Sequence, residues 1–228
     1  DVLLKGINEG SLKNMAKLVE EGGISTMIAP VPPTTPVSMS SILTGDSPGV
    51  HGVYSFEKNP TEGKGYNNYG DIKSSTIFGA ADPEKKVISI NTPMTYPPPE
   101  INGKIVSGFP AGSRDIAWPP DVNRELKKSD YRIEPAGIHE GREKYVRDVF
   151  ELAEKRFRKA QEWISEDWDL FFMWFTGDAR LQHYIEDDEV VMDFYRKVDT
   201  YIGDFLDYLD EDITVMIVSD HGFSELEV

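Results

Sequence analysis

The chain has 228 residues, of which 39% are hydrophobic and 11% aromatic, and its formal net charge is −16. These values fit one sizeable packed domain, or a core with one inserted subdomain, and argue against a disordered chain. The negative charge argues against non-specific nucleic-acid binding, and no apolar run approaches the roughly 20 residues that span a bilayer. Because cysteine is absent, any metal site must use Asp, Glu, His and hydroxyl oxygens.

The predicted elements alternate between helices and apolar strands. Helical spacing of apolar residues predicts the helices, and short continuous apolar runs predict strands buried on both faces. In chain order the predicted elements are a helix over residues 1–26 interrupted near Gly10, a strand over 25–29, a short helix over 38–43, a surface loop over 57–71, a strand over 87–90, a helix over 142–165, a strand over 170–175, a helix over 190–209 and a strand over 214–218.

This alternation predicts an α/β fold, a three-layer α/β/α sandwich whose sheet is largely parallel and covered on both faces. Proline-rich stretches at 97–99 and 110–120 predict an irregular insertion within about 57–140, over one end of the sheet. We therefore expect residues 1–228 to form a single domain with this insertion.

Polar side chains follow three of the predicted strands. Asp220-His221 comes directly after the run 214–218, Asp178 and His183 follow 170–175, and Thr34-Thr35 follow 25–29. Ligands of open α/β sheets bind beyond the carboxyl ends of strands, and zinc accepts both carboxylate and imidazole ligands. The alternative interpretation of Asp220 is a turn residue that caps the following segment, and that of His183 a solvated or structural histidine.

Thr35 precedes Pro36 at the start of a short Ser-rich helix. A threonine hydroxyl at such a position, bound to a metal, could be deprotonated near neutral pH, and the helix N-terminus would attract a phosphate. Most threonine hydroxyls only cap helices or stabilise turns, so Thr35 alone predicts little. The hydroxyl, Asp and His side chains at all three strand ends together favour metal-assisted phosphoryl transfer. His51, in a Pro-Gly turn, is expected to make a structural hydrogen bond.

The sequence closely resembles a known family in residues 32–45 (PPTTPVSMSSILTG) and 47–54 (SPGVHGVY). These are similar to the nucleophile segment of the type I phosphodiesterase/nucleotide pyrophosphatase family, in the microbial phosphohydrolase/phosphomutase branch of the alkaline phosphatase superfamily. Residues 219–223 (SDHGF) and 180–183 (RLQH) resemble two of its metal-binding motifs, and 90–98 and 103–109 are also similar to this branch. The resemblance covers nearly the whole chain.

The resemblance implies a catalytic domain that cleaves phosphate mono- or diesters through a phospho-threonine intermediate. Thr35 is the implied nucleophile, with Thr34 as the reserve, and Ser38 and Asn91 are the candidates for binding the substrate phosphate. The expected partner is a small phosphorylated substrate, with neither nucleic acid nor membrane, and the expected location is the cytoplasm. A phosphomutase and a non-catalytic binding module with a degenerate site remain as alternatives.

The resemblance also implies two divalent cations, zinc or manganese. Asp220 and His221, together with Thr35, would bind the cation that activates the nucleophile, and His183 with Asp178 would bind the other. The family's aspartate stands four residues before its histidine, where this chain has Ala179. Either Asp178 takes that role in a shifted geometry, or Ala179 disables the first metal site.

Two further ligands of the family have no counterpart in the sequence. Asp1 lies too close to the first helix to be the family's upstream aspartate, and the family's final histidine would come after Val228. We therefore expect the chain to be part of a longer enzyme, truncated at both ends. Phe56 stands where nucleotide pyrophosphatases carry a phosphate-binding asparagine, which favours the phosphohydrolase/phosphomutase branch.

Overall fold

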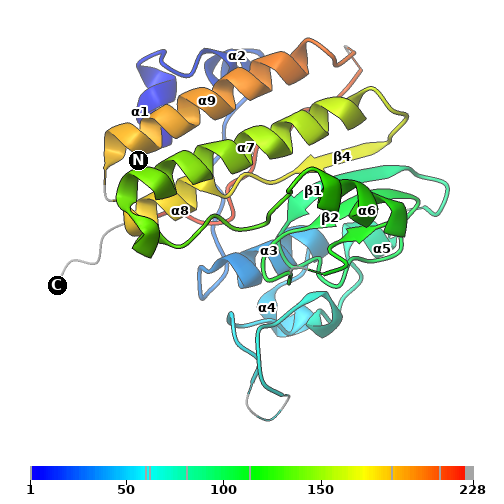
Figure 1. The fold of residues 1–228 in the computed structure, drawn as a ribbon. Coiled ribbons are helices and arrows are strands. Elements are labelled where there is room, and N and C mark those ends of the chain that lie inside the picture. The colour runs from blue at the N-terminus through cyan, green and yellow to red at the C-terminus, as the bar shows by residue number, and fades with distance from the viewer. Residues whose placement is uncertain are drawn as a thin grey trace.

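The sheet at the centre of the molecule is mainly parallel (Figure 1). The computed structural model describes residues 2–59, 61, 63–80, 82–112, 114–185, 187–210 and 212–223. Its strand order is β3-β2-β1-β4. β1 (Val87–Thr92) pairs in parallel with β2 (Gly103–Ser107) and β4 (Leu170–Met173), whereas β3 (Ala117–Trp118) runs antiparallel to β2. The predicted α/β class and largely parallel sheet are confirmed.

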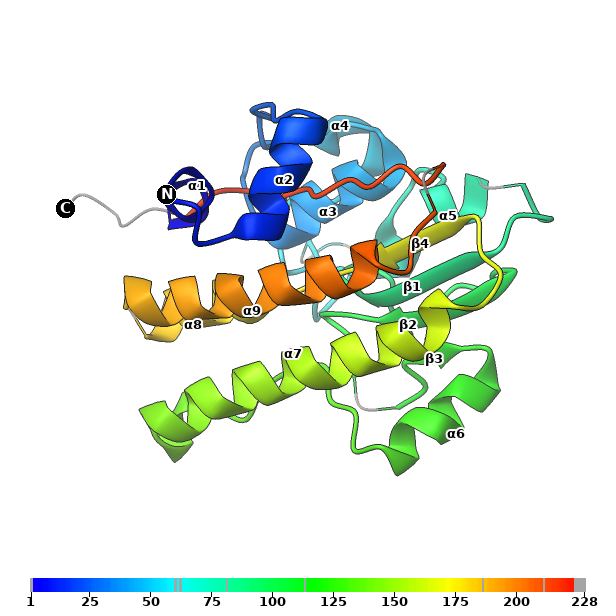
Figure 2. The same ribbon diagram turned by 90° about the horizontal axis from the view of Figure 1, so that it is seen from above.

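Helices cover both faces of this sheet (Figure 2). Alternate residues of a strand point to opposite faces. Accordingly Ile88 and Ile90 pack with α7 (Arg142–Ile164) and α6 (Pro120–Lys128), and Val87 packs with α3 (Thr35–Thr44) and α5 (Ile77–Ala80). The short helices α4 (Pro48–His51), η1 (Tyr69–Asp71) and η2 (Ile138–Glu140) lie in the connections.

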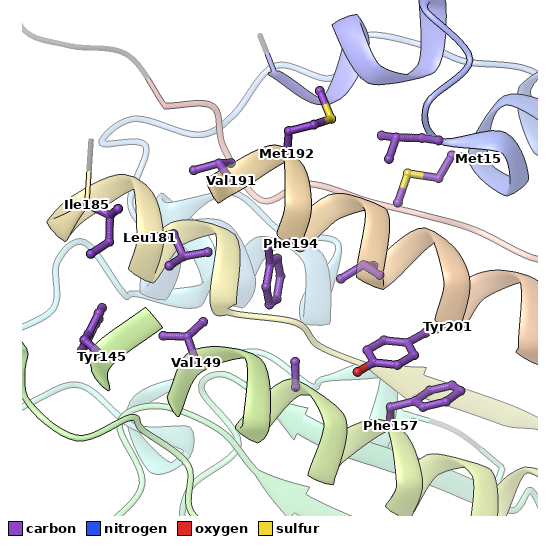
Figure 3. Close-up of a cluster of buried hydrophobic side chains, with 13 residues drawn as sticks. Met15, Tyr145, Val149, Phe157, Leu181, Ile185, Val191, Met192, Phe194 and Tyr201 are labelled. Atoms are coloured by element: carbon purple, nitrogen blue, oxygen red, sulfur yellow. The ribbon is translucent and has the colours of Figure 1, made fainter. Parts of the chain in front are cut away.

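A third apolar cluster joins α7 to α8 (Gly177–Tyr184) and α9 (Asp188–Leu206) (Figure 3). Gly177 and Leu181 are the buried residues of α8, and Leu181 belongs to this cluster, whereas His183 is exposed. Phe157 stacks on Tyr201 with ring centroids 3.9 Å apart, and Phe150 meets Phe194 edge-on. This packing fixes the position of α8 at the end of β4.

The predicted N-terminal helix consists of two helices, α1 (Val2–Asn8) and α2 (Lys13–Glu21), separated at Gly10, whose φ of 73° breaks the helix. Leu12 at the start of α2 has no side-chain acceptor for the free backbone N–H groups of the first turn. Asp199 of α9 accepts two of them, from Met15 at 2.8 Å and from Asn14 at 3.1 Å. α2 is thereby capped from another helix.

Two predicted strands are wrong. Residues 25–29 and 214–218 are irregular, and Ile28 and Met216 remain 94% and 78% exposed. A strand exists only through hydrogen bonds to a neighbour, and neither apolar run finds one in the described part of the chain. Conversely, β2, β3 and α6 were not among the predicted elements. No helix among the described residues combines the length and apolarity that a membrane crossing requires.

Candidate active site

Thr35 stands in the first turn of α3. The preceding Thr34 has an extended backbone, with φ −124° and ψ 150°, and Pro36 is pre-set for helical φ, so the helix starts here rather than at residue 38 as predicted. The Thr34 carbonyl accepts the backbone N–H of Ser38 at 2.9 Å. The Thr35 hydroxyl therefore lies at the positive end of a helix dipole.

His221 reaches this hydroxyl from the other end of the chain. Its Nε2 lies 3.2 Å from Thr35 Oγ1. Its Nδ1 lies 2.8 Å from the carbonyl oxygen of Gly222, which can only accept, so Nδ1 carries the proton. In the neutral ring the Nε2 lone pair is consequently aimed at Thr35 and can accept the hydroxyl proton or bind a cation.

Asp220 adds a carboxylate to the same point. Its Oδ2 lies 3.4 Å from His221 Nε2 and finds no hydrogen-bond partner among the described residues. Burial raises the pKa of Asp220, an effect that His221 and Thr35 only partly offset. Atoms with lone pairs from Thr35, Asp220 and His221 thus lie close together.

α8 brings Asp178 and His183 to the neighbourhood of this group. The Tyr195 hydroxyl donates to Asp178 Oδ2 at 3.2 Å. Burial raises the pKa of Asp178, and the negative charge of Asp220 raises it further. Burial lowers the pKa of His183, and the charges of Arg180 and His221 act in the same direction. Asp178 and His183 are therefore electrostatically coupled to Asp220 and His221 respectively.

Ser38 and Asn91 are buried polar residues with unused hydrogen-bonding groups. Ser38 is 1% exposed and Asn91 is fully buried. The Ser38 hydroxyl and both amide atoms of Asn91 find no hydrogen-bond partner among the described residues. Asn91 has a positive φ of 59° and lies where the β1–β2 register shifts, at the carboxyl end of β1. A ligand would satisfy such groups, which are costly to leave unpaired.

Comparison with known protein families gives a match over nearly the whole chain. The profile described as type I phosphodiesterase / nucleotide pyrophosphatase matches residues 3–227. The chain belongs to this family. It is therefore a member of the alkaline phosphatase superfamily, and its relatives are phosphoric ester hydrolases, generally metal-dependent, that act on small phosphorylated substrates. Neither the curated proteins nor the solved structures gave a match.

The metal ions that this phosphodiesterase family implies could be bound by the types of side chain present in the candidate site. Asp220 and His221 bring a carboxylate and an imidazole to the Thr35 hydroxyl, and α8 carries a second carboxylate and imidazole on Asp178 and His183. Hard and borderline cations bind such ligands. A cation would satisfy the unpartnered Oδ2 of Asp220, and the Nε2 atom of His221 beside it could serve as a second ligand. Within the described ranges, however, no three His, Asp or Glu side chains gather closely enough to hold a metal by themselves.

The structure adds residues that the sequence analysis did not single out. Arg180 stands one helical turn before His183, a spacing visible in the sequence. Tyr195 and Arg156 reach the site region only through tertiary packing, and Arg156 donates from Nη1 to the hydroxyl of Thr176, just before α8, at 2.8 Å. His51 makes the predicted structural hydrogen bonds, to Ser41 and to the backbone N–H of Val53.

Proposed function

We propose that this protein hydrolyses phosphate mono- or diesters by transferring the phosphoryl group to Thr35. The observation that carries the proposal is the 3.2 Å contact between Thr35 Oγ1 and a His221 nitrogen whose lone pair faces the hydroxyl. A hydroxyl becomes a competent nucleophile when an adjacent base takes its proton, or when a cation that the adjacent group binds favours the deprotonated form. The N-terminus of α3 adds positive potential where the phosphate would bind.

The proposed reaction has two steps, transfer of the phosphoryl group to Thr35 and hydrolysis of the phospho-threonine. Thr35 Oγ1 bonds to phosphorus as the bond to the leaving alcohol breaks, and the alcohol departs with a proton. Water then cleaves the phospho-threonine, which restores the hydroxyl and releases phosphate or a phosphomonoester. Ser38 and Asn91 would donate unused hydrogen bonds to the phosphoryl oxygens.

Divalent cations are proposed to complete the site, with zinc or manganese as the candidates. Asp220 and His221 would hold one cation beside Thr35, and His183 with Asp178 would hold the other. Bound there, the cations would supply positive charge to the nucleophile and to the phosphoryl oxygens. Elemental analysis after incubation with zinc or manganese and removal of free metal is expected to find about two ions per chain.

Adjacent threonines provide a matched test of the nucleophile. Hydrolysis of 4-nitrophenyl phosphate and bis-(4-nitrophenyl) phosphate by metal-supplemented protein would be compared for Thr35→Ala, Thr35→Ser and Thr34→Ala. We expect Thr35→Ala to lose on the order of 10³-fold or more in kcat/KM, while Thr35→Ser and Thr34→Ala keep measurable turnover. Acid quenching during turnover should trap a phosphoryl group on residue 35. Unchanged turnover in Thr35→Ala would exclude this mechanism.

The same preparation separates the two alternatives. A phosphomutase would return the phosphoryl group to another hydroxyl of a phosphosugar or phosphoglycerate, so product analysis would find an isomer and little free phosphate. A binding module would show no metal-dependent turnover with any of these esters.

A further inference from the structure

A recess of about 420 Å³ is lined in part by α8, the helix that carries Asp178 and His183. Its walls include Phe109 after β2, the loop 134–139, and Arg180 and Tyr184 on α8. Tyr145 contributes from α7, and it lies at the α8 end of the buried cluster (Figure 3). Since β2 and β4 are both parallel to β1, Phe109 and α8 follow strand ends at the same edge of the sheet. The recess therefore opens at the edge where ligands of such folds bind.

An ion pair lies in this wall. Arg180 Nη2 lies 2.6 Å from Glu134 Oε2, and the guanidinium lies over the ring of Phe109 at 5.9 Å from its centroid. Phe109 is in turn contacted by the rings of Phe56 and Tyr66, at 5.8 and 5.6 Å. The pair is not sealed off, because the side chains of Arg180 and Glu134 remain 26% and 36% exposed.

A paired guanidinium and carboxylate offer donors and acceptors side by side with little net charge. A vicinal diol matches such a surface, since each hydroxyl both donates and accepts. Tyr145 and Tyr184, whose rings meet edge-to-face with centroids 5.5 Å apart, supply an apolar wall for the carbon skeleton. An anionic group fits less well, because Glu134 already neutralises the charge of Arg180. An unsubstituted aromatic group also fits less well, because it would form no hydrogen bonds with the ion pair.

We infer that this recess binds the leaving group of the substrate and selects a sugar or polyol that carries a vicinal diol. The inference rests on the proposed function, because α8 places Arg180 one turn before His183 and so joins the recess to the phosphoryl site. The substrate class is accordingly a phosphorylated sugar or polyol. Glu134 and Arg180 determine specificity through the diol and take no part in bond cleavage.

The test compares ribose 5-phosphate with 2-deoxyribose 5-phosphate, which differ by one hydroxyl of the diol. Calorimetric titration of metal-supplemented Thr35→Ala protein avoids turnover. Ribose 5-phosphate is expected to bind on the order of tenfold tighter than 2-deoxyribose 5-phosphate, because its additional hydroxyl forms a hydrogen bond to a charged group. Adding Glu134→Gln should reduce the preference to about twofold or less. Glu166→Gln is the matched control, because Glu166 is 40% exposed and forms an ion pair with Lys104 outside the recess. This variant should preserve the preference for ribose 5-phosphate.

A third variant separates contact with the diol from contact with the carbon skeleton. Tyr184→Leu changes an exposed side chain of the wall and should weaken both sugars equally. Equal affinities for the two sugars in the parent protein, or failure of both to bind, would overturn the inference. So would a preference that survives Glu134→Gln in a folded variant. Failure of the proposed function would be seen separately, as hydrolysis of 4-nitrophenyl phosphate that does not depend on Thr35.

Discussion

Gly177, the first residue of α8, has no room for a side chain. A Cβ built at this position would lie 2.2 Å from both Cε2 and Cζ of Phe194. Carbon atoms normally pack about 3.5–4.0 Å apart, so the two groups would have to separate by about 1.3 Å or more. Phe194 is 1% exposed and packs edge-on against Phe150, which leaves it little freedom to retreat.

Gly177→Ala should therefore destabilise the protein by about 1–3 kcal/mol, the usual cost of overpacking a core. In a protein of this size the corresponding fall in melting temperature is about 2–12 °C. Thermal unfolding followed by circular dichroism would measure it. Because the displaced α8 carries Asp178 and His183, hydrolysis of 4-nitrophenyl phosphate should fall as well.

A double mutant shows whether the contact with Phe194 is the cause. Phe194→Leu removes the ring atoms that the new Cβ would meet. Gly177→Ala combined with Phe194→Leu should be less destabilised than the sum of the single variants, by about 1 kcal/mol or more. Two effects that added within about 0.5 kcal/mol would exclude a clash with Phe194 as the cause. So would a Gly177→Ala variant that melted at the temperature of the unmodified protein.

Two further predictions concern buried basic side chains. Burial lowers the pKa of His51, and the charge of Asp46 only partly offsets this effect. The neutral, buried His51 therefore contributes its full stability above the unfolded pKa of about 6.5. This contribution is lost as the pH falls toward the folded pKa. His51→Gln, which can still donate toward Ser41, should lose less melting temperature between pH 7.5 and 5.5 than the unmodified protein; an equal loss would contradict this. Arg156→Met should destabilise by about 1–3 kcal/mol in urea unfolding, since Thr176 and other buried acceptors lose a charged donor. An unchanged midpoint would mean that this hydrogen bond contributes nothing.

Local sequence patterns were sufficient for the long helices and for the fold class. The apolar periodicity of α7 and α9 predicted them to within a few residues, because each helix buries one continuous stripe and satisfies its own backbone. The parallel sheet was predicted from the alternation of these helices with the apolar runs 170–175 and 214–218. The first run contains β4, which is parallel to β1, whereas the second is not a strand.

Strand pairing was decided by tertiary structure. The apolar runs 25–29 and 214–218 have the composition of strands, yet neither is hydrogen-bonded into the sheet, because a strand depends on a partner that its own residues do not specify. β2 is the converse case, since it pairs with β1 although its own sequence was not sufficient to predict a strand.

In the candidate site, too, the residue types could be predicted from the sequence, whereas their geometry could not. Sequence motifs identified Thr35 and His221, which stand 186 positions apart, but the 3.2 Å contact between them exists only in the folded chain. The tautomer of His221 depends on the Gly222 carbonyl, and the raised pKa of Asp178 depends on burial and on Asp220. Residue types are local properties of a sequence, whereas distances, desolvation and electrostatic coupling arise when distant segments pack together.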